Sequence, residues 1–204
     1  MARRRAGAGF VIVDEFGRFS GETAFQMALL EIKKFPAPVL AQPAQPVTVF
    51  DDRLRALVES MVQTMYAAPG IGLAAPQVGV SSRIVVVDVD HENPGRRLFK
   101  LVNPVLLEFE GVLSWEEGCL SVADFSAEVR RAARVRVRAL TPEQEEVVVE
   151  AEGLLAVALQ HEIDHIEGKL FIDRISRLKR DLYRRKVAKL SRQRADHEGR
   201  RRVS

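Results

Sequence analysis

The chain has 204 residues, of which 47% are hydrophobic, and this is enough to build one domain around a full core. It contains a single cysteine, Cys119, so an internal disulfide is excluded and a reducing, cytoplasmic setting is expected. No apolar run approaches the ~18 residues that a membrane-spanning helix needs, and no apolar signal-peptide core follows the basic residues at the start.

The net charge of +3 hides an uneven distribution of charge. Residues 174–204 contain 13 lysines and arginines against 3 aspartates and glutamates, whereas the rest of the chain has 18 basic and 25 acidic residues. A strongly basic tail on a mildly acidic body indicates a tail that meets a polyanion. The alternative is a solvated helix that docks on the body through a thin apolar stripe.

Residues 1–28 are poorly patterned, and we expect them to form a flexible extension. Residues 29–35 indicate a short strand that runs into a proline-punctuated segment. Asp51 or Asp52 then offers an N-cap, and the apolar residues that follow recur at helical spacing. They predict an amphipathic helix that ends near Ala67 and buries Leu54, Leu57, Val58, Met61, Val62 and Met65.

Residues 69–77 break this helix with two prolines and two glycines. Such a segment fixes a specific backbone path where another chain or a ligand can come close. A phosphate-binding loop is excluded, because no GK[ST] sequence follows the glycines.

Short strands are predicted over residues 83–89, 98–102, 105–109 and 112–115. Residues 134–139 alternate strictly, so their arginines should point outward from a half-exposed strand, and a solvated sheet face is favoured over nucleic-acid contact. A turn at residues 141–144 leads into a returning strand at residues 146–150. The sequence therefore predicts an α+β fold of mostly antiparallel strands around a central helix, with an N-terminal amphipathic helix and a C-terminal basic helix at about residues 176–191.

The central helix should begin near Gly153 and end near Gly168. Its HExxH sequence places His161 and His165 about one turn apart, so both rings can converge on one metal ion. Glu162 can then act on a water molecule bound to that ion. Two histidines on an ordinary helix remain the alternative for this motif alone.

A catalytic ion needs a third protein ligand. The metzincin pattern fails because position 171 is Phe171 instead of histidine, and no acidic residue lies about 20 residues downstream in an apolar helix. Upstream, Cys119 follows Gly118 just before a short strand and could point at the metal; otherwise it is an inert buried residue. A thiolate with two imidazoles suits Fe²⁺ as well as Zn²⁺, Co²⁺ or Ni²⁺.

Three motifs, GIGLAAPQ at residues 70–77, EGCLS at residues 117–121 and QHEIDH at residues 160–165, resemble in order and spacing the signature motifs of peptide deformylases. The resemblance covers roughly residues 29–190. It implies an enzyme that removes the N-formyl group from the initiator methionine of nascent polypeptides and releases formate. The implied ion is Fe²⁺, for which Ni²⁺, Co²⁺ or Zn²⁺ can substitute. The implied roles are metal binding by Cys119, His161 and His165, general base and acid catalysis by Glu162, and oxyanion binding by the Gln77 side chain and the Leu120 backbone N–H.

The same resemblance suggests how substrate binds. The glycine turn lets a peptide lie alongside as an added strand, and the methionine side chain would enter an apolar pocket. Ala123 stands where the family usually has proline, and the loop of residues 124–128 is unlike that of common members, which leaves peptide preference open. The candidate contacts are Ile71, Gly72 and Gly118 for the backbone and Leu154, Val157 and Ala158 for the pocket wall, with plain core packing as the alternative for the last three.

Residues 1–28 are expected to be an extension, residues 29–175 the catalytic domain and residues 176–204 a basic helix and tail. Family members usually begin near Met27, so residues 1–26 should be a dispensable arm or an incorrectly assigned start. The resemblance also implies that the basic helix contacts ribosomal RNA near the nascent-chain exit, and we expect a cytoplasmic monomer without membrane contact. The rival hypotheses are a metalloprotease with the same HExxH motif and an RNA-associated protein with a vestigial site.

Overall fold

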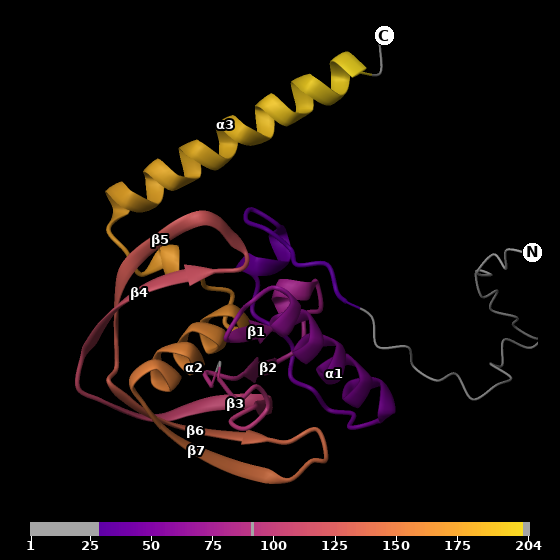
Figure 1. The fold of residues 1–204 in the computed structure, drawn as a ribbon, viewed down its shortest axis with the longest axis vertical. Coiled ribbons are helices and arrows are strands. Elements are labelled where there is room, and N and C mark those ends of the chain that lie inside the picture. Colours follow the sequence, from indigo (N-terminus) through magenta and orange to yellow (C-terminus); the bar gives the residue numbers. More distant parts are fainter. Residues whose placement is uncertain (1–28, 91, 202–204) are drawn as a thin grey trace, which may run out of the picture.

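The computed structural model describes residues 29–90 and 92–201, so the predicted N-terminal extension lies outside the described part of the chain (Figure 1). The helices are α1 (Asp52–Ala67), α2 (Gly153–Ile166) and α3 (Arg177–Arg201), with short 3-10 helices η1 (Pro38–Ala41), η2 (Ala75–Val78) and η3 (Phe171–Asp173). The strands are β1 (Gly72–Ala74), β2 (Ile84–Val87), β3 (Phe99–Glu110), β4 (Leu113–Cys119), β5 (Val122–Arg131), β6 (Arg134–Leu140) and β7 (Glu146–Glu152). None of these described helices is both long and apolar enough to cross a membrane.

The larger sheet has five antiparallel strands in the order β1-β2-β3-β6-β7, and it packs against both α1 and α2 (Figure 1). Strand β2 is apolar throughout because both of its faces are buried. Val85 and Val87 point into the cluster that contains α2, whereas Ile84 and Val86 point into the cluster that contains α1. The predicted α+β class, with strands packed around a central α2, is confirmed.

The outer face of β6 carries the predicted arginines. Arg136 lies between Glu108 of β3 and Glu150 of β7 in the strand register, and it forms an ion pair with Glu108 at 3.0 Å. Alternation along β6 buries Val135 and Val137 and leaves Arg134 exposed. The prediction of a solvated sheet face with arginines outward is therefore confirmed.

Strands β4 and β5 form a separate two-stranded sheet, which curls over the open side of α2. Among the described residues, no strand pairing joins this small sheet to the larger one. Its position places Cys119, the last residue of β4, next to the buried central helix.

Three local predictions differ from the structure. The strands expected at residues 98–102 and 105–109 form one bulged strand, β3, whose register shifts where Pro104 lacks an N–H and Asn103 has φ +52°. The loop expected at residues 124–128 is part of β5, because Ala127 pairs with Glu117 of β4. No strand is assigned to residues 29–35, although this segment still donates backbone hydrogen bonds from Lys33 and Phe35.

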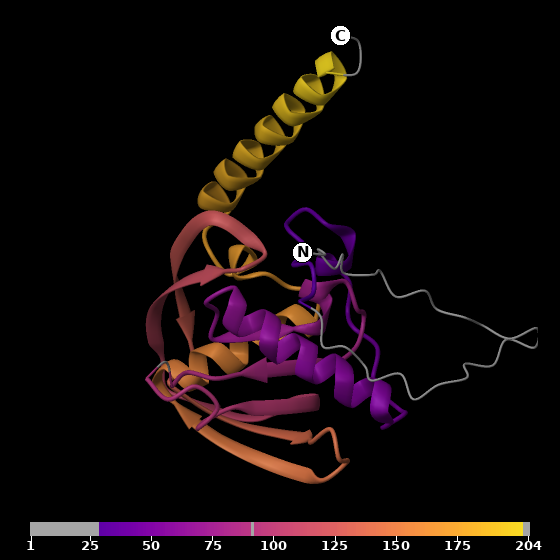
Figure 2. The ribbon, with the colours of Figure 1, turned by 45° about the vertical axis from the view of Figure 1, so that its right-hand side comes forward.

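Helix α3 stands away from the body in two views, rooted only at its first turns (Figures 1 and 2). It continues to residue 201, beyond the predicted end near residue 191. Docking of its apolar stripe on the body, the alternative to contact with a polyanion, is met only in part: Val187 packs against the body, whereas Leu178 and Leu182 are 71% and 56% exposed. Tyr183 is the buried anchor instead, and its ring packs 4.7 Å from Phe125 of β5, measured between centroids.

Candidate metal centre and active site

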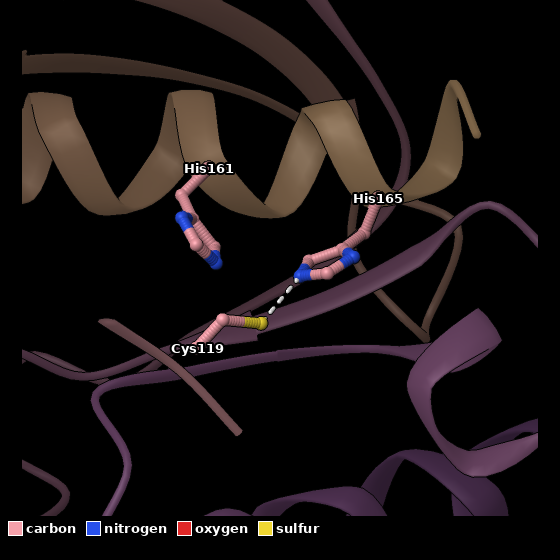
Figure 3. Close-up of side chains that lie close together, drawn as sticks. All are labelled: Cys119, His161 and His165. Atoms are coloured by element: carbon pink, nitrogen blue, oxygen red, sulfur yellow. Dashed lines mark hydrogen bonds between the residues drawn. The ribbon is translucent and has the colours of Figure 1, made fainter. Parts of the chain in front are cut away.

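Two histidines of α2 and one cysteine of β4 converge in the interior of the fold. The ligand atoms of Cys119, His161 and His165 all lie within 4.8 Å of one another. Figure 3 shows both imidazoles pointing from one side of α2 toward the sulfur, and the Cys119 Sγ to His165 Nε2 distance is 3.2 Å. The structure thus brings together the three residues that were predicted as metal ligands.

This donor set fits a divalent metal ion. A thiolate and two neutral imidazoles are ligands that zinc and the late first-row metals accept, and three protein ligands leave a coordination position open. His165 is 1% exposed, and its burial lowers its pKa well below 6.5, which favours the neutral ring that a metal requires. Burial also acts to lower the pKa of His161, but hydrogen bonds to Cys119 and Glu117 outweigh it and raise this pKa well above 6.5, so a metal would displace a proton from this ring.

A cleft of about 410 Å³ opens beside this cluster. All residues predicted for catalysis, substrate binding or metal binding line this cleft except His165, which is buried and is not part of the lining. Sequence reasoning missed Trp115 and Glu116, which also border the cleft. The predicted residues in the lining are Ile71, Gly72, Gln77, Gly118, Cys119, Leu120, Leu154, Val157, Ala158, His161 and Glu162.

Glu162 and Gln77 present polar atoms at the metal cluster. Burial raises the pKa of the Glu162 carboxyl from 4.5 to about 7, and its buried Oε2 has no hydrogen-bond partner among the described residues. Gln77 accepts a 2.7 Å hydrogen bond from the Ala74 N–H through Oε1, so its Nε2 faces the Cys119 sulfur at 3.6 Å. A carboxyl group and an amide donor therefore line the cleft beside the Cys119–His161–His165 cluster.

The raised pKa of Glu162 predicts a pH-dependent stability in the metal-free protein. Neutral Glu162 stabilises the fold fully below pH 4.5, and this contribution is lost as the pH rises through about 7. Glu162→Gln removes this titration, so at pH 8 it should stabilise the metal-free protein by on the order of 3 kcal/mol relative to the parent protein, with little effect at pH 4. Denaturant unfolding of both proteins at the two pH values measures the difference, and an equal effect at both would contradict the prediction.

Gly72 leaves the room that the Glu162 side chain occupies. A Cβ at position 72 would lie 2.4 Å from Glu162 Oε1 and 2.8 Å from its Cδ, which forces the carboxyl to move. Because displacement by about 1 Å at a reacting centre costs roughly 10²-fold, we expect Gly72→Ala to lower kcat by about that factor. In a Glu162→Ala background the same change should leave kcat almost unaltered, and a double-mutant cycle on kcat tests this. Additive losses of kcat would contradict the claim that Gly72→Ala acts by displacing the Glu162 carboxyl.

A buried ion-pair network supports the cluster, and sequence reasoning missed it. Arg131 is 3% exposed and binds Glu117 and Asp164, and Glu117 Oε2 lies 2.7 Å from His161 Nδ1. Burial acts to raise the pKa of Glu117, but hydrogen bonds from Arg131 and His161 outweigh it and lower this pKa to about 2. An ionised Glu117 accepts the Nδ1–H of His161 and leaves Nε2 for a metal. Glu117 and Asp164 lie within the motifs, but nothing separates Arg131 from its arginine-rich surroundings in the sequence.

Comparison with known proteins agrees with this geometry. The family model of polypeptide deformylase matches residues 29–181. The peptide deformylase of Alkalilimnicola ehrlichii is 51% identical over 82% of this chain and 93% of its own, and that of Syntrophobacter fumaroxidans is 48% identical over 80% and 96%. A crystal structure of the Legionella pneumophila peptide deformylase matches with a TM-score of 0.76 and 44% identity, covering 82% of this chain and 98% of its own.

Proposed function

The chain belongs to the polypeptide deformylase family, metal-dependent hydrolases that remove the N-formyl group from nascent peptides, and we propose that Glu162 is the general base and acid of this reaction. The observation that supports this role is the convergence of Glu162, the Cys119–His161–His165 cluster and Gln77 on one cleft. The family implies a divalent metal, and the three clustered residues would hold it.

A formyl amide is an unactivated carbonyl, so its hydrolysis needs a strong nucleophile, stabilisation of the developing charge and a protonated leaving amine. When bound, a divalent ion supplies an acidified water and polarises the formyl oxygen. Glu162 takes a proton from the attacking water and later passes it to the departing nitrogen, a role worth roughly 10²–10⁴-fold. Formate and a free N-terminal amine leave.

Gln77 and Leu120 are proposed to hold the oxyanion. The Gln77 amide already points at the metal cluster, and Leu120 follows Cys119 at the edge of the cleft. Lys34 Nζ donates to the Leu120 carbonyl at 2.5 Å, and the Phe35 N–H donates to Ser121, so the N-terminal segment fixes this turn from behind. Each oxyanion donor is worth on the order of 3 kcal/mol.

Substrate is proposed to bind as an added strand at β1, which is an edge of the larger sheet. Ile71 and Gly72 on one side and Gly118 on the other offer backbone groups to such a peptide. The methionine side chain would pack against the apolar part of the lining, formed by Leu154, Val157 and Ala158.

Release of formate from a formyl-methionyl tripeptide, measured after anaerobic purification, tests the proposed activity. We propose Fe²⁺ as the native ion, with Ni²⁺, Co²⁺ or Zn²⁺ as substitutes, because a thiolate and two imidazoles suit all four. Metal analysis of the same preparation should find one metal ion per chain, with more iron than nickel, cobalt or zinc. Cleavage of internal peptide bonds without formate would instead support the metalloprotease hypothesis.

Helix α3 is proposed to contact ribosomal RNA near the exit of the nascent chain, in a monomeric cytoplasmic enzyme. Its exposed lysines and arginines project from a helix that stands clear of the body, and RNA attracts such a basic surface. The predicted division of the chain at residues 28 and 175 stays a prediction.

Neutralising three exposed basic residues of α3 should weaken ribosome binding. We expect the triple change Arg185→Ala, Lys189→Ala and Arg192→Ala to lower the slope of log affinity against log salt by up to about three, one for each lost phosphate contact. Co-sedimentation with ribosomes at several salt concentrations measures this slope. The matched control removes the same charge from the sheet through Arg134→Ala, Arg136→Ala and Arg138→Ala, and equal losses in both variants would contradict a specific contact.

A further inference from the structure

Four charged side chains form a continuous chain from the root of α3 to His161. Arg174 lies between η3 and α3, and it binds Asp164 through two contacts of 2.5 Å, from Nε to Oδ2 and from Nη2 to Oδ1. Arg131 Nη1 donates to the same Asp164 Oδ2 at 2.5 Å. Arg131 Nε and Nη2 then bind Glu117 at 2.6 and 2.9 Å, and Glu117 accepts from His161.

Arg174 is the member of this chain that reaches solvent. Its side chain is 41% exposed, whereas those of Asp164, Arg131 and Glu117 are 7%, 1% and 3% exposed. The three buried groups carry two negative charges and one positive charge, so Arg174 supplies the charge that balances them. Buried charge is tolerated only when it is paired in this way.

We propose that Arg174 is a positioning residue for His161, acting through Asp164, Arg131 and Glu117. The proposal rests on the metal-binding role proposed above for the Cys119–His161–His165 cluster. It extends that role to a residue outside the cleft, at the point where the C-terminal helix leaves the body.

The effect of Arg174 reaches His161 through the guanidinium of Arg131, which binds both Asp164 and Glu117. With Arg174 in place, Asp164 receives two of its three donated hydrogen bonds from Arg174, and Arg131 commits Nε and Nη2 to Glu117. Without Arg174, Asp164 draws on Arg131 alone, and the paired contact to Glu117 loosens. Glu117 then holds the His161 ring less firmly, so Nε2 is presented to the metal less well.

Retention of Co²⁺ by the full chain tests the inference without relying on activity. Loss of a partner one step from a metal ligand weakens metal binding 10- to 100-fold, and Arg174 acts through further steps, so we expect Arg174→Ala to release Co²⁺ to a chelator about 10-fold faster. The Co²⁺ absorption bands of Arg174→Ala should also shift. Arg174→Lys keeps the charge but not the two-point contact, so its rate of Co²⁺ release should lie between those of the parent protein and Arg174→Ala. Arg55→Ala is the matched control, since Arg55 is also 41% exposed and binds Asp52 through Nε and Nη2 at 3.2 and 2.7 Å.

Parental Co²⁺ release and an unchanged spectrum in Arg174→Ala would overturn the inference, even if its melting temperature fell, because Arg174 would then only stabilise the fold. If Arg174→Ala does not fold, Arg174→Lys decides, and release at the parental rate overturns the inference. Failure of the underlying site is separately visible: the parent protein would bind Co²⁺ without a thiolate charge-transfer band, or Cys119→Ser would bind it equally well.

Discussion

Replacement of Glu162 by glutamine is expected to lower kcat on a formyl-methionyl peptide by roughly 10²–10⁴-fold while the metal content stays unchanged. Glutamine preserves the size of the side chain but cannot accept a proton from water or return it to the leaving nitrogen. The neighbouring ligands His161 and His165 keep their places, because α2 is buried along almost its whole length. The loss should therefore fall on kcat rather than on KM.

Formate release at saturating peptide, together with metal analysis, measures this effect. Glu167→Gln is the matched control, because Glu167 directly follows the same helix but pairs with Arg83 at the surface. Parental kcat in Glu162→Gln would reject Glu162 as the proton carrier. A proportional loss of metal would show that the substitution acted on the cluster instead.

Replacement of Cys119 by serine is expected to abolish stoichiometric metal binding and to lower kcat/KM by at least roughly 10³-fold. A neutral hydroxyl is a much poorer ligand for a late transition metal than a thiolate. The charge stabilisation that an ion supplies amounts to several kcal/mol, which corresponds to three or more orders of magnitude in rate. The buried histidine pair alone offers two ligands, fewer than a catalytic site requires.

Chelation and reconstitution separate this effect from misfolding. Parent protein stripped of metal should regain activity on addition of Fe²⁺ or Ni²⁺ under anaerobic conditions, whereas stripped Cys119→Ser should not. Similar circular dichroism spectra of the two proteins serve as the control for folding. Full reconstitution of the serine variant would remove Cys119 from the ligand set.

The elements with a strong periodic pattern could be predicted from the sequence. Helix α1 appears with Asp51 as its N-cap, because apolar residues recur on one face and the Asp51 side chain accepts from the Leu54 N–H. Helix α2 is also where its HExxH motif requires it. Both patterns are local, and local patterns determine helices well.

Long-range partners were harder to predict. Arg131 looks like one more surface arginine in its run, and only the fold shows that it is buried between Glu117 and Asp164. The apolar stripe of α3 suggested docking on the body, yet its leucines are exposed and Tyr183 anchors the helix. The burial of Arg131 and the exposure of the α3 leucines depend on residues that are distant in the sequence, and residue spacing carries little information about such contacts.

The separate β4–β5 sheet has a consequence for how the centre fails. A two-stranded sheet is marginally stable by itself, so this hairpin depends on its side-chain contacts with the core, among them buried Val129 and the ion pair of Arg131 with Asp164. Cys119 belongs to the hairpin, and His161 and His165 belong to α2. Cys119 already lines the cleft, so an oxidant can reach its sulfur there without any opening of the hairpin. Oxidation of this one sulfur would then be enough to empty the centre, although both histidines keep their places on α2.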